Sequence, residues 1–236
     1  MRVGAIIAGA GESSRFSGGK SPSSPFDRKQ FKPLGDEPLI LVTARPFLEC
    51  DLIDSVVLVV PEDALPWMEE EVRKNRWQKE VRVVSGGLER QESVRNGLEV
   101  IAGSCDVVVI HDAVRPFVRS SWIEETVGLC VAYDGAIVAV QASDTLKRVE
   151  EGVILETVER RGVWQAQTPQ AFRTASLLSA FNRAGSTGGT ATDEAQLVER
   201  NGGRVAVIPG SPLNLKITSP EDWDLALSLW EGRRDD

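Results

Sequence analysis

The stretch Val3–Arg15 reads VGAIIAGAGESSR and changes character halfway along. Its first half is apolar and rich in Val and Ile, which is typical of a buried strand. Its second half is a run of small residues that ends at Arg15, which is typical of a tight glycine-rich loop. Backbone N–H groups in such a loop can hold an anion, and Arg15 adds a positive charge. The stretch predicts either a nucleotide-binding loop or an ordinary turn after a first strand.

Two common phosphate-binding patterns do not match this loop. The dinucleotide fingerprint G-x-G-x-x-G begins at Gly9 and Gly11, but Ser14 stands where its third glycine belongs. The P-loop pattern ends correctly at Gly19-Lys20-Ser21, but Ser14 also occupies the position of its first glycine. The first mismatch disfavours a dehydrogenase, and any phosphate must be bound in a third way.

Composition and charge exclude several classes of protein. The 236 residues predict a single domain over 1–236, and a net charge of −8 argues against a nucleic-acid binder. No apolar run approaches the ~18 residues of a membrane span, and we expect no secretion signal. The odd number of scattered cysteines (Cys50, Cys105 and Cys130) favours reduced thiols over a disulfide framework or a zinc site. A cytoplasmic location is therefore expected.

Apolar runs alternate with helical patterns along most of the chain. The expected strands are Arg2–Ala8, Ser55–Val60, Val81–Val84, Asp106–Ile110, Ala136–Val140, Arg204–Ile208 and Leu213–Ile217. The expected helices are Leu39–Cys50, Glu62–Arg76, Arg90–Ala102, Ser121–Ala132, Ala175–Arg183, Asp193–Asn201 and Glu221–Glu231. This alternation predicts a mostly parallel, three-layer α/β/α sheet with ligands outside the carboxyl ends of its strands.

Lysines stand near two places where a ligand could lie. Residues 17–28 are rich in Gly, Ser and Pro, and this segment is long enough to be a lid. It ends beside Lys29, which could close on a phosphate, although Lys20 or Lys32 could serve equally well. Lys216 lies in an apolar segment, where a lysine is expected to be paired or functional.

Two further strand ends carry residues suited to a nucleotide. Gly86-Gly87 permit close approach of a ligand to the backbone, and Ser93 follows in the first turns of a helix. Asp112 comes directly after an apolar strand, a usual place for a metal-binding carboxylate, and Arg115 can meet a second phosphate. His111 is interpreted as structural, because phosphoryl transfer depends on positioning and charge more than on a strong base.

Residues 141–165 break the alternation and predict a two-stranded β-arm whose return strand is Val153–Val158. A hairpin that leaves a packed sheet is marginally stable alone, so pairing with a second copy would stabilise it. A homodimer is one interpretation, and a hairpin that lies on its own domain is the other.

In this order, the motifs resemble those of the 2-C-methyl-D-erythritol 4-phosphate cytidylyltransferases, over nearly the whole chain. The resembling segments are Gly9–Phe16, Lys29-Gln30, Gly86–Val94, His111–Pro116, Asp144–Lys147, Thr157–Gln170, Thr192–Ala195 and Asn214–Lys216. The resemblance implies a Rossmann-like nucleotidyltransferase fold and transfer of CMP from CTP to methylerythritol phosphate. It departs from the family at Gly9, Arg28 and Val114, and in the greater length of the loop 17–28.

The resemblance also implies a role for each matching residue. The cations that would neutralise the phosphates and the developing charge on phosphorus are Arg15, Lys29, Lys216 and Arg160, the last acting on the neighbouring site of a dimer. Asp112 would help to hold Mg²⁺. The residues that would receive the cytidine are Ala10, Gly11, Gly87, Ser93 and Ala113. The residues that would hold the acceptor are Arg115, Thr145, Arg160, Thr168 and Thr192.

Two rival functions stay open at this point. A ribitol-5-phosphate or other polyol-phosphate cytidylyltransferase would use the same chemistry on a similar anion. A non-catalytic nucleotide-binding protein is disfavoured, because Arg15, Lys29, Asp112 and Lys216 are all present. The acceptor phosphate is already an anionic nucleophile, so either enzyme needs positioned cations and no general base.

Overall fold

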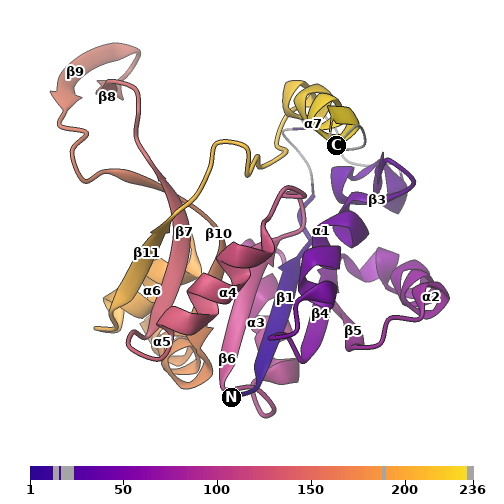
Figure 1. Ribbon diagram of the computed structural model, residues 1–236. Coiled ribbons are helices and arrows are strands. Elements are labelled where there is room, and N and C mark those ends of the chain that lie inside the picture. Colours follow the sequence, from indigo (N-terminus) through magenta and orange to yellow (C-terminus); the bar gives the residue numbers. More distant parts are fainter. Residues whose placement is uncertain (13–15, 17–23, 188–189, 233–236) are drawn as a thin grey trace.

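A computed structural model describes residues 1–12, 16, 24–187 and 190–232 (Figure 1). Seven strands form one sheet in the order β11-β7-β10-β6-β1-β4-β5, and only β10 runs antiparallel to its neighbours. The strands are β1 (Val3–Ala8), β4 (Ser55–Val60), β5 (Glu80–Ser85), β6 (Val107–Asp112), β7 (Gly135–Gln141), β10 (Trp164–Arg173) and β11 (Val205–Pro209). The predicted mostly parallel α/β sheet is confirmed.

Helices cover both faces of the sheet because successive strand residues point to opposite sides. One buried cluster joins the strands to α1 (Leu39–Glu49), α2 (Leu65–Asn75) and α4 (Ser120–Leu129). A second cluster joins the other face to α3 (Arg90–Ile101), α5 (Thr174–Thr187) and α6 (Glu194–Arg200). Ile7 of β1 belongs to the first cluster and Ile6 to the second, so β1 lies in the core of a three-layer structure.

The last helix covers the end of the sheet where the ligand is expected. Helix α7 (Pro220–Gly232) packs through Ala226 against a third apolar cluster that includes Val114 and Ile217. The same cluster contains Leu34 of the short ribbon formed by β2 (Pro33–Leu34) and β3 (Glu37–Pro38). This packing fixes the segment before α7, which carries Lys216.

The structure differs from the predicted strands in two places: one predicted strand is absent, and one strand of the sheet was missed. Leu213–Ile217 forms no strand, because its backbone turns at Asn214. It joins the body through the Ile217 N–H, which donates to the Val114 carbonyl, and through the Asn214 carbonyl, which accepts from Arg115 Nη1 at 2.7 Å. The ten-residue strand β10 was not predicted at all. Its sequence, WQAQTPQAFR, lacks apolar alternation and contains Pro169, which argues against a central strand. The structure accommodates the proline where the β10–β7 register shifts, between Ala166 and Gln170.

The predicted β-arm contains the hairpin of β8 (Leu146–Glu150) and β9 (Val153–Val158). Figure 1 shows the hairpin extending away from the sheet at the end of β7. The chain then returns through β10, which pairs antiparallel with both β7 and β6. The excursion therefore reverses the chain direction in the middle of the sheet and brings Thr168 beside Asp112.

Candidate active site

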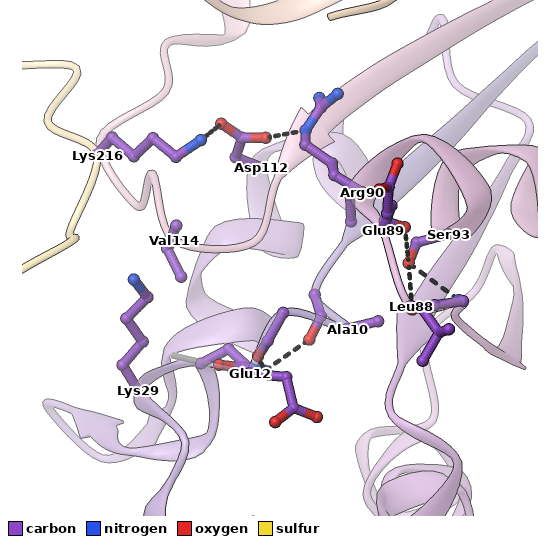
Figure 2. A pocket seen from close by; sticks show the side chains of 15 residues that line it. Ala10, Glu12, Lys29, Leu88, Glu89, Arg90, Ser93, Asp112, Val114 and Lys216 are labelled. Carbon is purple, nitrogen blue, oxygen red and sulfur yellow. Dashed lines mark hydrogen bonds and ion pairs between the residues drawn. The ribbon is translucent and has the colours of Figure 1, made fainter. Parts of the chain in front are cut away.

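A cavity of about 250 Å³ lies at the carboxyl ends of β1, β5 and β6 (Figure 2). The loop after β1 contributes Gly9 to Glu12, and the turn after β5 contributes Gly87 to Arg90. Asp112, Lys29 and Lys216 complete the wall, so segments distant in sequence meet here. Parallel strands bring their ends to one edge of a sheet, which is why the site forms there.

The glycine-rich loop is held from behind by a buried amide. Gln30, from the short 3₁₀ turn Lys29–Phe31, donates from Nε2 to the Gly9 carbonyl at 2.7 Å and to the Gly11 carbonyl at 2.9 Å. In front, the loop lies against the turn after β5. A Cβ atom added to Gly86 would lie only 2.1 Å from the Ala10 Cβ, which is too close for two side chains. Only glycine permits that approach, so the two loops form one surface.

The backbone N–H and carbonyl groups of the turn before α3 form hydrogen bonds with side chains of the same turn and the first turn of the helix. The Ser93 hydroxyl accepts from the Gly87 N–H at 3.1 Å and donates to the Glu89 carbonyl at 3.1 Å. Glu89 and Glu92 form a reciprocal capping box, and Glu92 also accepts from the Leu88 N–H. The carboxylates therefore occupy the amino end of α3, and this helix end offers little to a phosphate.

Asp112 is the centre of an ion network. Its Oδ1 accepts from Arg90 Nε at 3.0 Å, and its Oδ2 lies 2.9 Å from Lys216 Nζ and 3.4 Å from Arg115 Nε. Arg90 in turn donates from Nη1 to both carboxylate oxygens of Glu194 at 2.8 Å. Three cations thus surround two carboxylates, so the network carries one net positive charge when both carboxylates are ionised.

A second cavity of about 200 Å³ adjoins the first. It is lined by Arg115, Thr168 and Thr192, and it shares Arg90, Asp112 and Lys216 with the first cavity. These three side chains therefore stand where the two cavities meet. An anion in one cavity and an anion in the other would both reach Lys216.

Asp112 and Arg90 keep their charges despite burial. Burial alone would raise the pKa of Asp112, but Arg90, Lys216 and Arg115 together hold that pKa well below its usual range. Burial would also lower the pKa of Arg90, but Asp112 and Glu194 outweigh this and raise it. Asp112 is therefore ionised and Arg90 protonated at neutral pH.

A neutral histidine supports Asp112 from the core side. The His111 Nε2 lies 3.0 Å from the Arg115 carbonyl, which can only accept, so Nε2 carries the hydrogen and Nδ1 accepts from the Thr168 hydroxyl at 2.9 Å. The Thr168 hydroxyl also accepts from the Asp112 N–H at 3.1 Å. Burial lowers the pKa of His111 to about 4, so this ring stays neutral and the interpretation of His111 as structural agrees with its contacts.

Most of the predicted site residues lie around the two cavities. The residues that line the first cavity are Ala10, Gly11, Lys29, Gly87, Ser93, Asp112 and Lys216. The residues that line the second are Asp112, Arg115, Thr168, Thr192 and Lys216. Thr168 is only 4% exposed and its hydroxyl hydrogen points to His111, so it has one lone pair and no hydrogen left for a ligand.

Four predicted residues are not placed at either cavity. Ala113 is fully buried, with its N–H on the Ala8 carbonyl and its carbonyl on the Thr43 hydroxyl. Thr145 is exposed in the segment before β8. Arg160 is exposed near the base of the arm, where its guanidinium donates to the Ser143 carbonyl. Arg15 lies outside the described residues.

Three important residues had no predicted role, namely Gln30, Arg90 and Glu194. All three stand in motifs that the sequence shows, but their partners are far away in the chain. Arg90 and Glu194 are 104 positions apart, and Gln30 contacts the loop after β1 across about twenty residues. Their presence in the motifs was the only available signal.

A preformed metal cage is absent from the part of the site that the structure describes, because no three His, Cys, Asp or Glu side chains there gather closely enough to hold an ion. Asp112 is the one carboxylate shared by both cavities, and each of its oxygens already faces a cation. One carboxylate of this kind could supply a single ligand to a Mg²⁺ ion whose other ligands come from bound molecules or water, a common arrangement for that ion.

A family model described as 2-C-methyl-D-erythritol 4-phosphate cytidylyltransferase matches residues 3–231. The chain is 41% identical over 230 residues to a protein of that name from Geobacter metallireducens, with 96% of each covered. It is 40% identical over 233 residues to one from Geobacillus kaustophilus, with 99% of each covered. The crystal structure of the cytidylyltransferase of that name from Thermus thermophilus superposes with a TM-score of 0.79 at 29% identity, covering 98% of this chain and 100% of that one.

The neutral, buried His111 predicts a pH dependence of stability. Its folded pKa of about 4 lies below the ordinary 6.5, so the unfolded chain binds more protons between these values and stability falls as pH falls through that window. At 1.36 kcal/mol per unit, the loss is about 3 kcal/mol by pH 4 and nil above pH 7. We expect His111→Gln, which also offers one donor and one acceptor but cannot titrate, to lack this loss. Urea unfolding of both proteins from pH 7 to pH 4 measures the difference, and parallel curves would contradict the assignment.

Proposed function

The chain belongs to the 2-C-methyl-D-erythritol 4-phosphate cytidylyltransferase family, and on that premise we propose that it transfers CMP from CTP to 2-C-methyl-D-erythritol 4-phosphate. An oxygen of the acceptor phosphate attacks the α-phosphorus in line. The bond from that phosphorus to the bridging oxygen breaks, and pyrophosphate leaves. The product is 4-diphosphocytidyl-2-C-methyl-D-erythritol. Nothing in the family or in the relatives favours the polyol-phosphate alternative.

The observation that carries this proposal is the pair of cavities that meet at Arg90, Asp112 and Lys216. The first, between two glycine-containing loops, suits the nucleotide. The second, with Arg115 and Thr192 in its wall, suits an anion that also carries hydroxyl groups. A reaction between two bound anions needs a shared cationic boundary, and this site has one.

Catalysis follows from charge and position. The acceptor phosphate needs no deprotonation, and the only histidine of the chain, His111, is neutral with both ring nitrogens engaged. Lys216 lies at the junction, where it can follow the charge that builds up on the α-phosphate oxygens. Lys29 lines the same cavity, and in Figure 2 its ammonium group points toward Val114 and Lys216. Arg15 and Ala113 keep only the roles that the resemblance implies.

We propose that Mg²⁺ enters with CTP. When bound, it would neutralise phosphate charge and help to align the triphosphate. Asp112 would be its carboxylate ligand, and Arg90 would still compensate Oδ1 if Lys216 moved from Oδ2 to a phosphate.

We also propose a homodimer formed through the β-arm. Val149, Val153, Ile154 and Leu155 of the hairpin are each more than half exposed, which is unusual for a two-stranded hairpin that stays in water. Arg160 and Thr145 lie on this excursion and line neither cavity of their own chain. Pairing of two arms would bury the apolar side chains and could carry both residues to the partner's acceptor cavity.

The remaining expectations concern the setting of the enzyme. Among the described residues, none of the helices is long and apolar enough to cross a bilayer. All three cysteines are free and buried, which supports a reducing, cytoplasmic compartment. The acidic composition supports small-molecule substrates over a nucleic acid.

Pyrophosphate release tests the proposed function. We expect the purified protein with CTP and Mg²⁺ to release pyrophosphate rapidly with methylerythritol phosphate and slowly or not at all with ribitol 5-phosphate. Preference for ribitol 5-phosphate would keep the chemistry and overturn the acceptor. If neither acceptor leads to pyrophosphate release while CTP still binds, the result would favour a non-catalytic nucleotide-binding protein.

Removal of Lys216 should affect turnover more than acceptor binding. We expect Lys216→Ala to lower kcat by about a hundredfold or more, because a cation aimed at transition-state charge is lost, with little change in KM for the acceptor. Lys74→Ala, on the exposed face of α2, is the matched control and should keep full activity. A kcat near that of the wild type would remove Lys216 from the catalytic set.

Mixing of two inactive variants tests whether Arg160 acts on the partner. If it does, a heterodimer of Arg160→Ala and Lys216→Ala contains one site with both defects and one intact site. Random reassortment of equal amounts should then restore about one quarter of the wild-type activity. No recovery, in a sample whose sedimentation shows dimers that exchange subunits, would place Arg160 in its own chain's site. Full activity of Arg160→Ala by itself would place it in neither site.

A further inference from the structure

Glu194 is a buried carboxylate that lies outside the walls of the two site cavities. It lies at the amino end of α6 with 1% of its surface exposed, and both of its oxygens accept from Arg90 Nη1 at 2.8 Å. No step of the proposed reaction uses it directly.

The amino end of α6 does not explain why Glu194 is there. The neighbouring Asp193 is the N-cap residue, and its Oδ1 accepts from the Gln196 N–H at 3.0 Å. Glu194 instead directs both oxygens away to a helix that begins 104 positions earlier. A carboxylate taken out of water costs several kcal/mol, and a buried ion pair often stabilises a fold no better than apolar residues would. Stability alone is therefore a weak reason for this pair.

The geometry points to a further function: we propose that Glu194 is a positioning residue, which through Arg90 holds the Asp112 carboxylate in place between the two cavities. The inference rests on the proposed cytidylyl transfer and adds a residue to it. Arg90 presents Nη1 to Glu194 and Nε to Asp112, so the planar guanidinium links both carboxylates in one rigid arrangement.

The consequence concerns Lys216. With Arg90 fixed on Oδ1, Asp112 offers Oδ2 to Lys216 at 2.9 Å and to Arg115 at 3.4 Å. Lys216 is thereby held at the junction before substrates arrive, and Arg90 continues to compensate Asp112 once Lys216 turns to a phosphate. Without Glu194, Arg90 would be free to follow the phosphate itself, and Asp112 and Lys216 would lose their fixed positions.

The test is Glu194→Gln, which keeps the shape of the side chain and removes its charge. We expect kcat for pyrophosphate release to fall about tenfold, while KM for CTP and for the acceptor each change less than about threefold, because an interaction that orders the reacting groups is lost. Glu99→Gln is the matched control. It breaks another Glu–Arg pair, with Arg95 on the exposed face of α3, and should leave kcat unchanged. An unchanged kcat in Glu194→Gln would overturn the proposal.

A double variant distinguishes a positioning role of Glu194 from a general contribution to stability. If Glu194 acts through Arg90, then Glu194→Gln should change kcat less than about twofold in a chain that already carries Arg90→Met. Independent, multiplying losses in the double variant would overturn the proposal. Should Arg90→Met fail to fold, Arg90→Lys removes the forked geometry and keeps the charge.

Thermal unfolding of each variant is measured beside its kcat, because a loss of turnover that follows a loss of folded protein would make Glu194 merely structural. The wild-type assay keeps the two hypotheses apart. A wild-type protein that releases no pyrophosphate overturns the proposed function. An active wild type with a fully active Glu194→Gln overturns only the positioning role.

Discussion

One carboxylate organises this protein, because Asp112 is almost fully buried at the end of a central strand and must be compensated there. Arg90, Arg115 and Lys216 provide that compensation, and they come from the start of α3, the loop after β6 and the segment before α7. Burial of a charge without partners costs several kcal/mol of folding free energy, so the fold is more stable when all three segments place their cations beside Asp112. The cations that keep Asp112 ionised then stand where two anionic substrates would meet.

The sheet brings these groups together, and strand β10 makes the arrangement possible. A purely parallel sheet would place β6 beside β7 and leave the core side of Asp112 to a different neighbour. Because the chain leaves through the arm and returns antiparallel, Thr168 reaches the Asp112 N–H and the His111 ring. The same excursion exposes an apolar hairpin. The feature that completes the site is therefore also the basis of the proposed dimer.

The chemistry agrees with a site that has fixed charges and no titrating base. An acceptor phosphate is a nucleophile at neutral pH, so what limits its transfer is the repulsion between two anions and their alignment. The network reduces the repulsion between the two anions, because it carries one net positive charge at the junction of the cavities. Alignment is supported by Arg90, which donates from Nε to Asp112 and from Nη1 to Glu194, since a guanidinium held on two carboxylates has little freedom to move.

The sequence by itself determined the alternating α/β order, six of the seven strands of the sheet and the segments that carry Gly87 and Asp112, because apolar periodicity and glycine turns are local signals. It could not determine β10, whose polar, proline-containing sequence becomes a strand only where β6 and β7 offer it partners. Nor could it pair Arg90 with Glu194 or direct the Thr168 hydroxyl to His111. Those contacts join residues far apart in the chain, and only the tertiary structure decides which buried charges and hydrogen-bonding groups meet.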